Sequence, residues 1–267
     1  MVADMMTADI SIASITDTTT STAFDEQQFA EPYPDGIEQH YWTLARNRKV
    51  LEAVQIALAG EDKRLVVDIG CGRGITLDYL RKNGIEVLGC ELGHAKPISA
   101  EIAPFLQYDS DAVELPFEVR DTTGVLLLLD VLEHLPEPMN FLNSMADAFS
   151  NTHTVIVTVP ARQELWSNYD EYYGHFRRYD FASSEQLFDG NRFKVVFRGY
   201  LFRLLYLPAL LLKRMGKKRA ISIQAPKGVT LLIHKLIARW FDLESAVLAR
   251  SCPGTSLMLV LRRKQGA

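Results

Sequence analysis

Short apolar runs alternate with amphipathic stretches along most of this chain. Runs of this kind are typical of strands in a parallel sheet that has both faces covered. The clearest is Val125–Leu129, in which every residue is apolar. The same pattern predicts further strands at Leu65–Val67, Ile85–Cys90, Phe105–Tyr108, Thr154–Val159, Phe193–Phe197 and Ser256–Leu261.

Three stretches beside these runs carry apolar residues at helical spacing. Trp42–Leu58 is the longest, and Gly60 is its predicted end. Thr76–Lys82 and Met139–Phe149 are the other two. Strands and helices that alternate with short connections predict a parallel sheet with helices on both faces.

The order of these elements predicts an α/β fold with a doubly wound, mostly parallel seven-stranded sheet. The stretch before the last strand has helical character, so a helical insertion is predicted there. The expected segments are a flexible leader at 1–25, an N-terminal helical cap at 26–62, an α/β core at 63–198, a basic apolar helical insertion at 199–250, and the last strand and tail at 251–267.

Composition narrows the class of protein. Hydrophobic residues make up 48% of the chain and charged residues 23%, as in ordinary globular proteins. The formal net charge of −4 argues against a general nucleic-acid binder. Cys71, Cys90 and Cys252 give neither a disulfide framework nor a zinc spacing, which favours reduced thiols in the cytoplasm. Met1–Thr22 lacks the features of a signal peptide, and no apolar run is long enough to predict a membrane span.

A glycine-rich turn follows the first predicted strand, where an open α/β sheet binds its ligands. Gly70–Gly74 contains three glycines, which permit positive φ and a close approach of the backbone to a ligand. A dinucleotide fingerprint needs a glycine at position 75, but Ile75 stands there, so the spacing disfavours a nicotinamide oxidoreductase. Asp68 precedes the turn, and Glu91 ends the next strand, where a carboxylate accepts hydrogen bonds from ribose hydroxyls. The alternative is an ordinary strand–helix turn.

Taken in this order, the motifs resemble those of the class I S-adenosylmethionine (SAM)-dependent methyltransferases over most of Arg64–Val159. Asp68–Gly74 resembles the loop that wraps the methionine part of SAM, and Glu91 the ribose-binding acid. Asp111–Ala112 resembles the pair beside the adenine, and Asp130–Leu135 the segment that closes over the cofactor. The resemblance implies a Rossmann-like methyltransferase fold and SAM as cofactor. The residues implied to bind it are Asp68, Gly70, Cys71, Gly72, Gly74, Glu91, Leu92, Asp111, Ala112, Asp130 and Val131.

One stretch departs from this resemblance. Leu92–Pro97 lacks the family's usual pattern after the ribose-binding acid, which leaves the adenine-side contacts there open but not the fold.

The loop after the fifth strand should overhang the cofactor cleft, because it begins at a strand's carboxyl end. His175–Tyr179 resembles a His-x-Arg-Arg-Tyr element of one subgroup of these methyltransferases. His175 is the candidate general base, since imidazole titrates in the useful range. Arg177 or Arg178 would hold an anionic acceptor by a bidentate contact. The alternative is that the arginines pair with local acids such as Asp170 or Glu171 and that His175 only orders the loop.

The same subgroup carries a Tyr-Trp pair and an arginine before the core, and a late Pro-Gly-x-Ser like Pro253–Ser256. The candidate substrate-binding residues are Tyr41, Trp42, Arg46, Trp166, Arg177, Arg178 and Tyr179.

A metal site is a further hypothesis. If the segment after the fourth strand is an α-helix, Asp130, Glu133 and His134 share one face, and His175 would complete a set of ligands. The set looks like the metal-binding element of small-RNA 2′-O-methyltransferases and of some quinone-pathway O-methyltransferases. The alternative, which we favour, is that Glu133 and His134 cap and brace the helix, because residue spacing alone does not establish metal ligation.

Basic charge is concentrated in one region. From Gly190 to Phe241 there are twelve Lys or Arg residues and no Asp or Glu, and the apolar run Leu204–Leu212 lies within it. Apolar stretches flanked by basic residues suit the surface of an anionic membrane, so peripheral contact through 200–240 is one expectation. The alternative is a helical cap over the substrate cleft or a dimer interface. A nucleic-acid partner is disfavoured by this apolar character.

The sequence therefore predicts an enzyme that moves a methyl group from SAM to a small-molecule or lipid-linked acceptor, with oxygen slightly favoured as the methylated atom. A SAM-binding partner or scaffold without transferase activity is the alternative from another class. The expected location is the cytoplasm, including the inner membrane surface, and the oligomeric state stays open.

Overall fold

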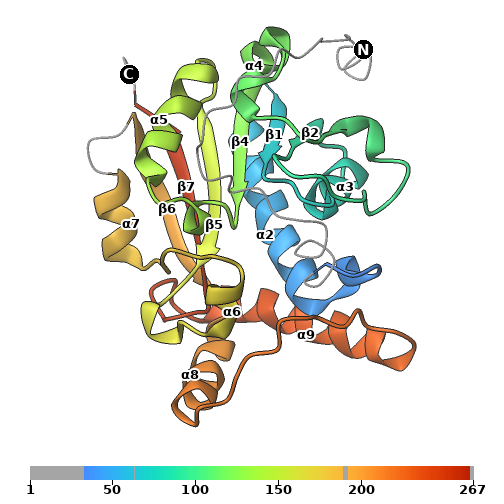
Figure 1. Ribbon diagram of the computed structural model, residues 1–267, viewed down its shortest axis with the longest axis vertical. Helices are drawn as coiled ribbons and strands as arrows, with labels where there is room; N and C mark the ends of the chain where they lie inside the picture. The colour runs from blue at the N-terminus through green and yellow to red at the C-terminus, as the bar shows by residue number, and fades with distance from the viewer. Residues whose placement is uncertain (1–32, 63, 189–191, 265–267) are drawn as a thin grey trace.

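A seven-stranded sheet forms the centre of the computed structural model, which describes residues 33–62, 64–188 and 192–264 (Figure 1). The strand order is β3-β2-β1-β4-β5-β7-β6. β7 runs in the opposite direction to the other six strands, so the predicted fold class, a doubly wound and mostly parallel sheet, is confirmed. The strands are β1 (Leu65–Ile69), β2 (Val87–Cys90), β3 (Leu106–Gln107), β4 (Thr123–Leu129), β5 (Thr154–Pro160), β6 (Phe193–Leu201) and β7 (Ser256–Arg263).

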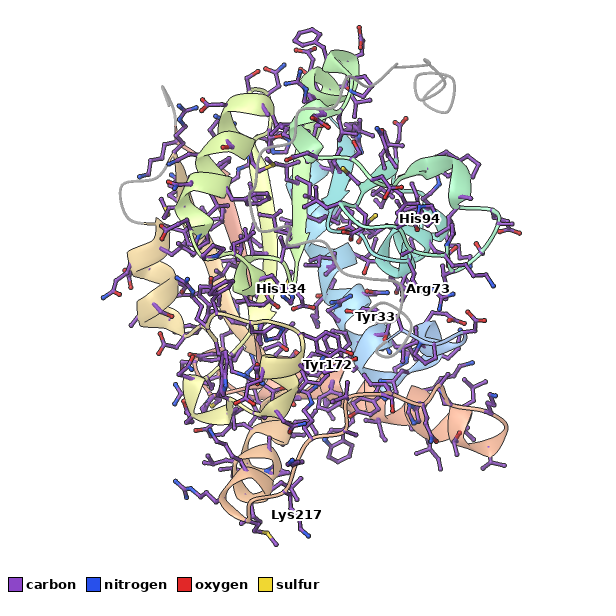
Figure 2. The ribbon with its side chains drawn as sticks, in the orientation of Figure 1. Tyr33, Arg73, His94, His134, Tyr172 and Lys217 are labelled. Carbon is purple, nitrogen blue, oxygen red and sulfur yellow. The ribbon has the colours of Figure 1, made fainter. Side chains whose placement is uncertain are left out.

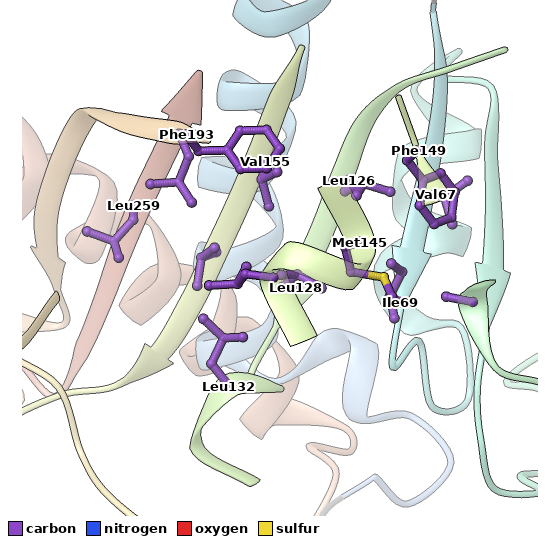
Figure 3. Close-up of a cluster of buried hydrophobic side chains, with 14 of the residues drawn as sticks. Val67, Ile69, Leu126, Leu128, Leu132, Met145, Phe149, Val155, Phe193 and Leu259 are labelled. Atoms are coloured by element: carbon purple, nitrogen blue, oxygen red, sulfur yellow. The ribbon is translucent and has the colours of Figure 1, made fainter. Parts of the chain in front are cut away.

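The two faces of the sheet bury alternate residues of each strand, as the pleat requires. In β1, Val67 and Ile69 face one hydrophobic core, whereas Val66 faces the other. The first core is closed by α4 (Phe117–Thr122), α5 (Pro138–Ala148) and α7 (Phe181–Phe188), and Figure 3 shows Met145 of α5 and the following Phe149 within it. The second is closed by α2 (Tyr41–Leu58), α3 (Ile75–Lys82) and α9 (Val229–Val247).

The predicted helices and strands differ from the observed ones mainly at their ends. α2 begins one residue earlier than predicted, at Tyr41, because the His40 side chain accepts a hydrogen bond from the Trp42 amide and caps the helix. The predicted strand Phe105–Tyr108 shrinks to two residues, since Phe105 belongs to the 3-10 turn η3 (Ala103–Phe105). β6 extends to Leu201, beyond the predicted Phe197.

The segment after the fourth strand is not the α-helix on which the metal hypothesis was conditional. The segment forms only the 3-10 turn η5 (Leu132–His134), and Asp130 lies outside it with a positive φ of 60°. The helical face that would have joined Asp130 to Glu133 and His134 therefore does not exist, and this part of the metal hypothesis was wrong.

The carboxyl end of the sheet is covered by loops and helices. After β5 come η6 (Gln163–Leu165) and α6 (Asn168–Tyr172). Between β6 and β7 lie η7 (Arg203–Leu205), α8 (Tyr206–Arg214) and α9. Figure 1 shows α6, α8 and α9 together at the lower end of the molecule, and α9 packs against α2. The predicted leader 1–25 lies outside the described residues, as do residues 26–32 of the predicted cap.

Candidate functional site

A large cavity opens at the carboxyl ends of the central parallel strands. Its volume is about 1160 Å³, more than one drug-sized ligand needs, so a cofactor and an acceptor fit in it together. Its walls come from the start of α2, the turns after β1, β2, β4 and β5, and the segment from α8 to α9. Figure 2 labels three of its lining residues: Tyr33 and His134 lie near the middle of the molecule, and Lys217 lies at its lower tip.

The glycine turn forms one end of this cavity. Gly70, Gly72 and Gly74 have φ values of 74°, 53° and 77°, in the left-handed region that favours glycine. A Cβ at Gly70 would lie 2.7 Å from Val131 Cγ2, so the turn leaves no room for a side chain there. Gly70 and Gly72 line the cavity with Cys71, whereas Gly74 lies behind them at the start of α3.

Two buried carboxyl groups flank the turn. Asp68 is 2% exposed, and burial raises its pKa to about 7. Its Oδ1 has no hydrogen-bond partner within the described residues, so a buried acceptor atom lies beside the turn. Glu91 accepts hydrogen bonds from the amides of Gly72 (2.9 Å) and Gly93 (3.3 Å), and burial raises its pKa. The carboxylate oxygens of Asp68 and Glu91 can therefore accept hydrogen bonds from a ligand that carries amine and hydroxyl groups.

The predicted adenine side lies next to Glu91. Asp111 caps the 3-10 turn η4 (Ala112–Glu114), and Leu92, Asp111 and Ala112 all line the cavity. The Leu92–Pro97 stretch, which departs from the family pattern, is tied to the glycine turn by Arg73, whose Nε donates to the Lys96 carbonyl at 2.9 Å. Arg73 also binds the Tyr33 carbonyl and the Asp35 carboxylate.

Asp130 and Arg46 form an ion pair in the cavity wall. Arg46 Nη1 lies 2.5 Å from Asp130 Oδ2, and its guanidinium stacks over the Trp42 ring at 4.4 Å. Thr158 donates to the other carboxylate oxygen of Asp130 at 3.3 Å. Arg46 therefore contacts both Asp130, predicted to bind the cofactor, and Trp42, predicted like Arg46 to bind the substrate.

His175 is held by a buried network. Its Nδ1 lies 2.9 Å from Asp170 Oδ1, and both side chains are nearly inaccessible to solvent. Arg178 donates from Nε (2.8 Å) and Nη2 (2.9 Å) to the same carboxylate, and the Ser167 amide donates to it at 2.8 Å. Burial by itself would raise the pKa of Asp170, but the hydrogen bonds from His175 and Arg178 hold it well below its usual range. In the tautomer in which Nδ1 donates a hydrogen bond to the Asp170 carboxylate, Nε2 is left as an acceptor.

Together with two further residues, His175 forms a group of possible metal ligands. The ligand atoms of Glu133, His134 and His175 all lie within 4.8 Å of one another. Burial raises the pKa of Glu133 well above its usual range and lowers that of His134 to about 3. Glu133 Oε2 has no hydrogen-bond partner in the described part of the chain, and one carboxylate with two imidazoles is a donor set that divalent ions accept. Asp130 is not a member of this group, because its carboxylate pairs with Arg46.

The other predicted substrate residues divide into two groups. Tyr41 lines the cavity, and Arg178 reaches it, although its guanidinium is engaged by Asp170, as the alternative interpretation expected. Trp166, Arg177 and Tyr179 are not among the lining residues. Arg177 donates to the Pro136 carbonyl at 2.7 Å, and Tyr179 donates to the Leu132 carbonyl at 3.1 Å.

The structure adds cavity residues that sequence reasoning missed. They come from segments without a motif, and only the apolar and basic character of 204–219 hinted at a role near the cleft. Two histidines connect the start of α2 to α9. The Tyr41 amide donates to Nδ1 of His234 on α9 at 3.2 Å, and the rings of His40 and His234 are in contact, with 4.7 Å between their centroids. Burial lowers the pKa of His40 to about 4. The additional lining residues include Tyr33, His40, Tyr169, Tyr173, Leu205, Ala209, Leu212, Lys213, Lys217, Lys218, Arg219 and His234.

Comparison with known proteins agrees with this geometry. A family model described as a methyltransferase domain matches residues 16–198, more than half of the chain. A ubiquinone biosynthesis O-methyltransferase of Aliivibrio fischeri is 32% identical over 87 residues, which cover 30% of this chain and 37% of the relative. The protein of the same name from Proteus mirabilis is 26% identical over 165 residues, covering 56% of this chain and 67% of the relative. The first relative is thus matched over little more than a third of its length.

Solved structures agree on the fold. The plantazolicin methyltransferase BamL, determined in complex with a triazolic desmethylPZN analog and SAH, superposes with a TM-score of 0.51 at 14% identity. The superposition covers 89% of this chain and 93% of that protein. The chain therefore belongs to the methyltransferase-domain family and has the Rossmann-like fold of class I SAM-dependent methyltransferases.

Proposed function

We propose that this protein transfers a methyl group from SAM to a hydroxyl oxygen of a small organic acceptor. The observation that carries the proposal is one continuous cavity that joins the glycine turn and its acids to His175. When bound, SAM supplies a methyl group already activated by a sulfonium, so the protein's task is to position the acceptor and manage its proton.

Asp68, Glu91 and the glycine turn would hold the cofactor. The buried Asp68 Oδ1 offers an acceptor, and the Glu91 carboxylate lies where a ribose would present hydroxyl donors. Asp130, fixed by Arg46, offers a second carboxylate in the wall of the same cavity. A dinucleotide is disfavoured, since Ile75 stands where its fingerprint needs glycine.

His175 would act as the general base. Its Nδ1 would donate a hydrogen bond to Asp170, and Arg178 and Ser167 hold the Asp170 carboxylate in place. The free Nε2 then takes the proton from an acceptor hydroxyl, which makes the oxygen a better nucleophile. The arrangement follows the same rule as a catalytic triad, in which a buried carboxylate orients the imidazole of the base.

A divalent ion at Glu133, His134 and His175 is the second candidate for activating the acceptor. The observation that favours it is the Asp170–His175 hydrogen bond, because metal-bound imidazoles usually donate their other N–H to a carboxylate. Such an ion would lower the pKa of an acceptor hydroxyl that it binds. Turnover that EDTA does not reduce would eliminate this candidate and leave His175 as the base.

The acceptor that suits the outer cavity is amphipathic and lipid-linked. Leu205, Ala209 and Leu212 give this part of the wall an apolar surface, and Lys213 and Lys217 place cationic groups beside it. An apolar chain with an anionic group complements both features. The ubiquinone biosynthesis relatives are named for O-methylation, which supports oxygen as the methylated atom. The cytoplasmic side of a membrane is the location that fits such an acceptor.

The experiment compares two histidine variants, H175Q and H153Q. His153 lies at the amino end of β5, at the opposite edge of the sheet from the cavity, so it serves as the matched control. We expect H175Q to lower S-adenosylhomocysteine formation by about 10²- to 10⁴-fold, with SAM affinity in calorimetry unchanged. H153Q should keep its activity. Full turnover in H175Q would refute the base, and SAM binding without turnover in the wild type across acceptor extracts would favour the scaffold alternative.

A further inference from the structure

One side of α9 is an unpartnered apolar stripe. Seven side chains at helical spacing are about half exposed or more, from Ile233 at 49% to Val229 at 79%. The other side of the helix carries Ala238 and Phe241, which pack into the core against α2. The stripe thus has no role in holding the fold together. It consists of Val229, Leu232, Ile233, Leu236, Trp240, Leu243 and Val247.

A second exposed stripe runs along α8 and its ends. Leu204, Leu207, Leu211 and Met215 recur at spacings of three and four residues, and Leu207 is 70% exposed. The side of α8 that carries Leu205, Ala209 and Leu212 lines the cavity. This helix is therefore apolar towards both the acceptor site and the outside.

Hydrogen bonds join the C-terminal part of α9 to η7, the turn that leads into α8. Glu244 of α9 accepts hydrogen bonds from the amides of Arg203 (2.8 Å) and Leu204 (3.0 Å), directly before α8. Figure 1 shows both helices at the same end of the molecule. We call the two stripes together the apolar end.

The exposed charged residues of α8, α9 and the connection between them are basic, whereas the two acids of α9, Asp242 and Glu244, pair with Arg48 and Arg203. Lys235 and Arg239 are exposed and lie one turn apart on α9, beside the stripe. Lys213, Arg214, Lys217, Lys218, Arg219 and Lys227 are exposed on α8 and the connection that follows it. No acidic residue occurs between Gly190 and Phe241. A neutral partner would not need this charge, whereas an anionic lipid surface complements it, and each basic group near such a surface adds to binding.

We propose that the apolar end inserts into the interface of an anionic phospholipid bilayer and that the acceptor enters the cavity from that bilayer past α8. The claim that the acceptor enters from the bilayer rests on the proposed function, whereas the claim that the apolar end inserts does not. No helix in the described part of the chain combines the length and apolar character that crossing a bilayer requires. The contact is therefore with one leaflet, through leucine and tryptophan side chains flanked by lysine and arginine.

The test measures co-sedimentation of the full chain with vesicles of phosphatidylcholine alone and with vesicles in which about a third of the lipid is the anionic phosphatidylglycerol. We expect binding only to the anionic vesicles, falling at least tenfold between low and high salt, because the Debye length shortens. Trp240 is 62% exposed, so its fluorescence should shift to the blue on binding, and W240F should lose that shift.

Three variants separate the possible outcomes. The triple variant L232S/L236S/L243S removes apolar side chains that lie outside the cavity, and K235E/R239E reverses the flanking charge. Each should bind anionic vesicles at least tenfold more weakly with unchanged SAM affinity. F117S, at an equally exposed site on α4, should bind like the wild type. The proposal is overturned if the wild type ignores anionic vesicles, or if it forms a dimer that only the triple variant dissociates, since the stripe is then an interface between copies.

Failure of the proposed function would look different. A protein that binds vesicles but forms no S-adenosylhomocysteine keeps the docking surface and loses the methyl transfer. A protein that methylates a soluble acceptor and ignores vesicles does the reverse.

Discussion

Replacing Asp170 with asparagine keeps the shape of this side chain and removes its charge. The carboxylate is completely buried and accepts from Arg178 at 2.8 and 2.9 Å, from His175 at 2.9 Å and from the Ser167 amide at 2.8 Å. In D170N the Arg178 side chain, 4% exposed, would keep its positive charge with no carboxylate beside it. Breaking one side of a buried ion pair costs about 3–5 kcal/mol, and the remaining amide oxygen favours the lower end of that range.

The expected loss is therefore about 3 kcal/mol of unfolding free energy, or a melting temperature lower by about 6–12 °C for a chain of this size. Thermal melting followed by circular dichroism at pH 7 measures it. The matched control is D147N, because Asp147 also pairs with an arginine, Arg192, but is 65% exposed. An exposed pair contributes little, so D147N should change stability by less than about 1 kcal/mol.

The pH dependence gives a second reading of the same interaction. The pKa of Asp170 is held below its unfolded value, so its contribution is fully present above the ordinary carboxyl pKa of about 3.9 and is lost as the pH falls further. The stability difference between the wild type and D170N should therefore shrink as the pH approaches 3. Equal melting temperatures for D170N and D147N at pH 7 would refute the argument that Asp170 is the buried anchor of this loop.

Three further predictions concern the glycine turn and its acids. D68N should stabilise the ligand-free protein by about 1–4 kcal/mol at pH 8 and by less at pH 5. The reason is that burial raises the pKa of Asp68 to about 7, so the stability of the wild type falls as the pH rises from the unfolded pKa to the folded pKa. A difference in melting temperature that does not change with pH would contradict this. G70A should weaken SAM binding at least tenfold in calorimetry, because its Cβ would lie 2.7 Å from Val131 Cγ2 at a φ of 74°, and V131A should restore part of the loss if the clash is the cause. E91Q should weaken SAM binding about 10- to 100-fold by removing a charged acceptor, whereas E118Q, exposed on α4, should not.

Local patterns predicted the sheet well. The strand at Val125–Leu129 was recognisable because a strand with both faces covered must be apolar throughout, and β4 is buried at every position. The glycine turn was recognisable for a related reason, since its positive φ values restrict the residues that it tolerates. Both features depend on residues that are close together in the sequence, so they can be recognised before the fold is known.

The partners of the charged residues were not predictable in the same way. Arg46 and Asp130 are 84 positions apart, and the sequence assigned them to different ligands. For Arg178 the sequence left two interpretations open, an anionic acceptor or a local acid, and the buried contact with Asp170 decided between them. Pairing of this kind depends on which side chains are desolvated together, and burial is a property of the whole fold.

The sequence by itself determined the α/β class, the strand pattern, the glycine turn with its two acids, and the basic apolar character of the region before the last strand. Only the tertiary structure decided that Asp130 faces Arg46 rather than Glu133, that Asp170 orients His175, and that α8 lines the cavity with one side and is exposed on the other. The reason is physical: backbone conformation and hydrophobic periodicity are set by residues a few positions apart, whereas ion pairs and cavity walls are set by segments that the folded sheet brings together.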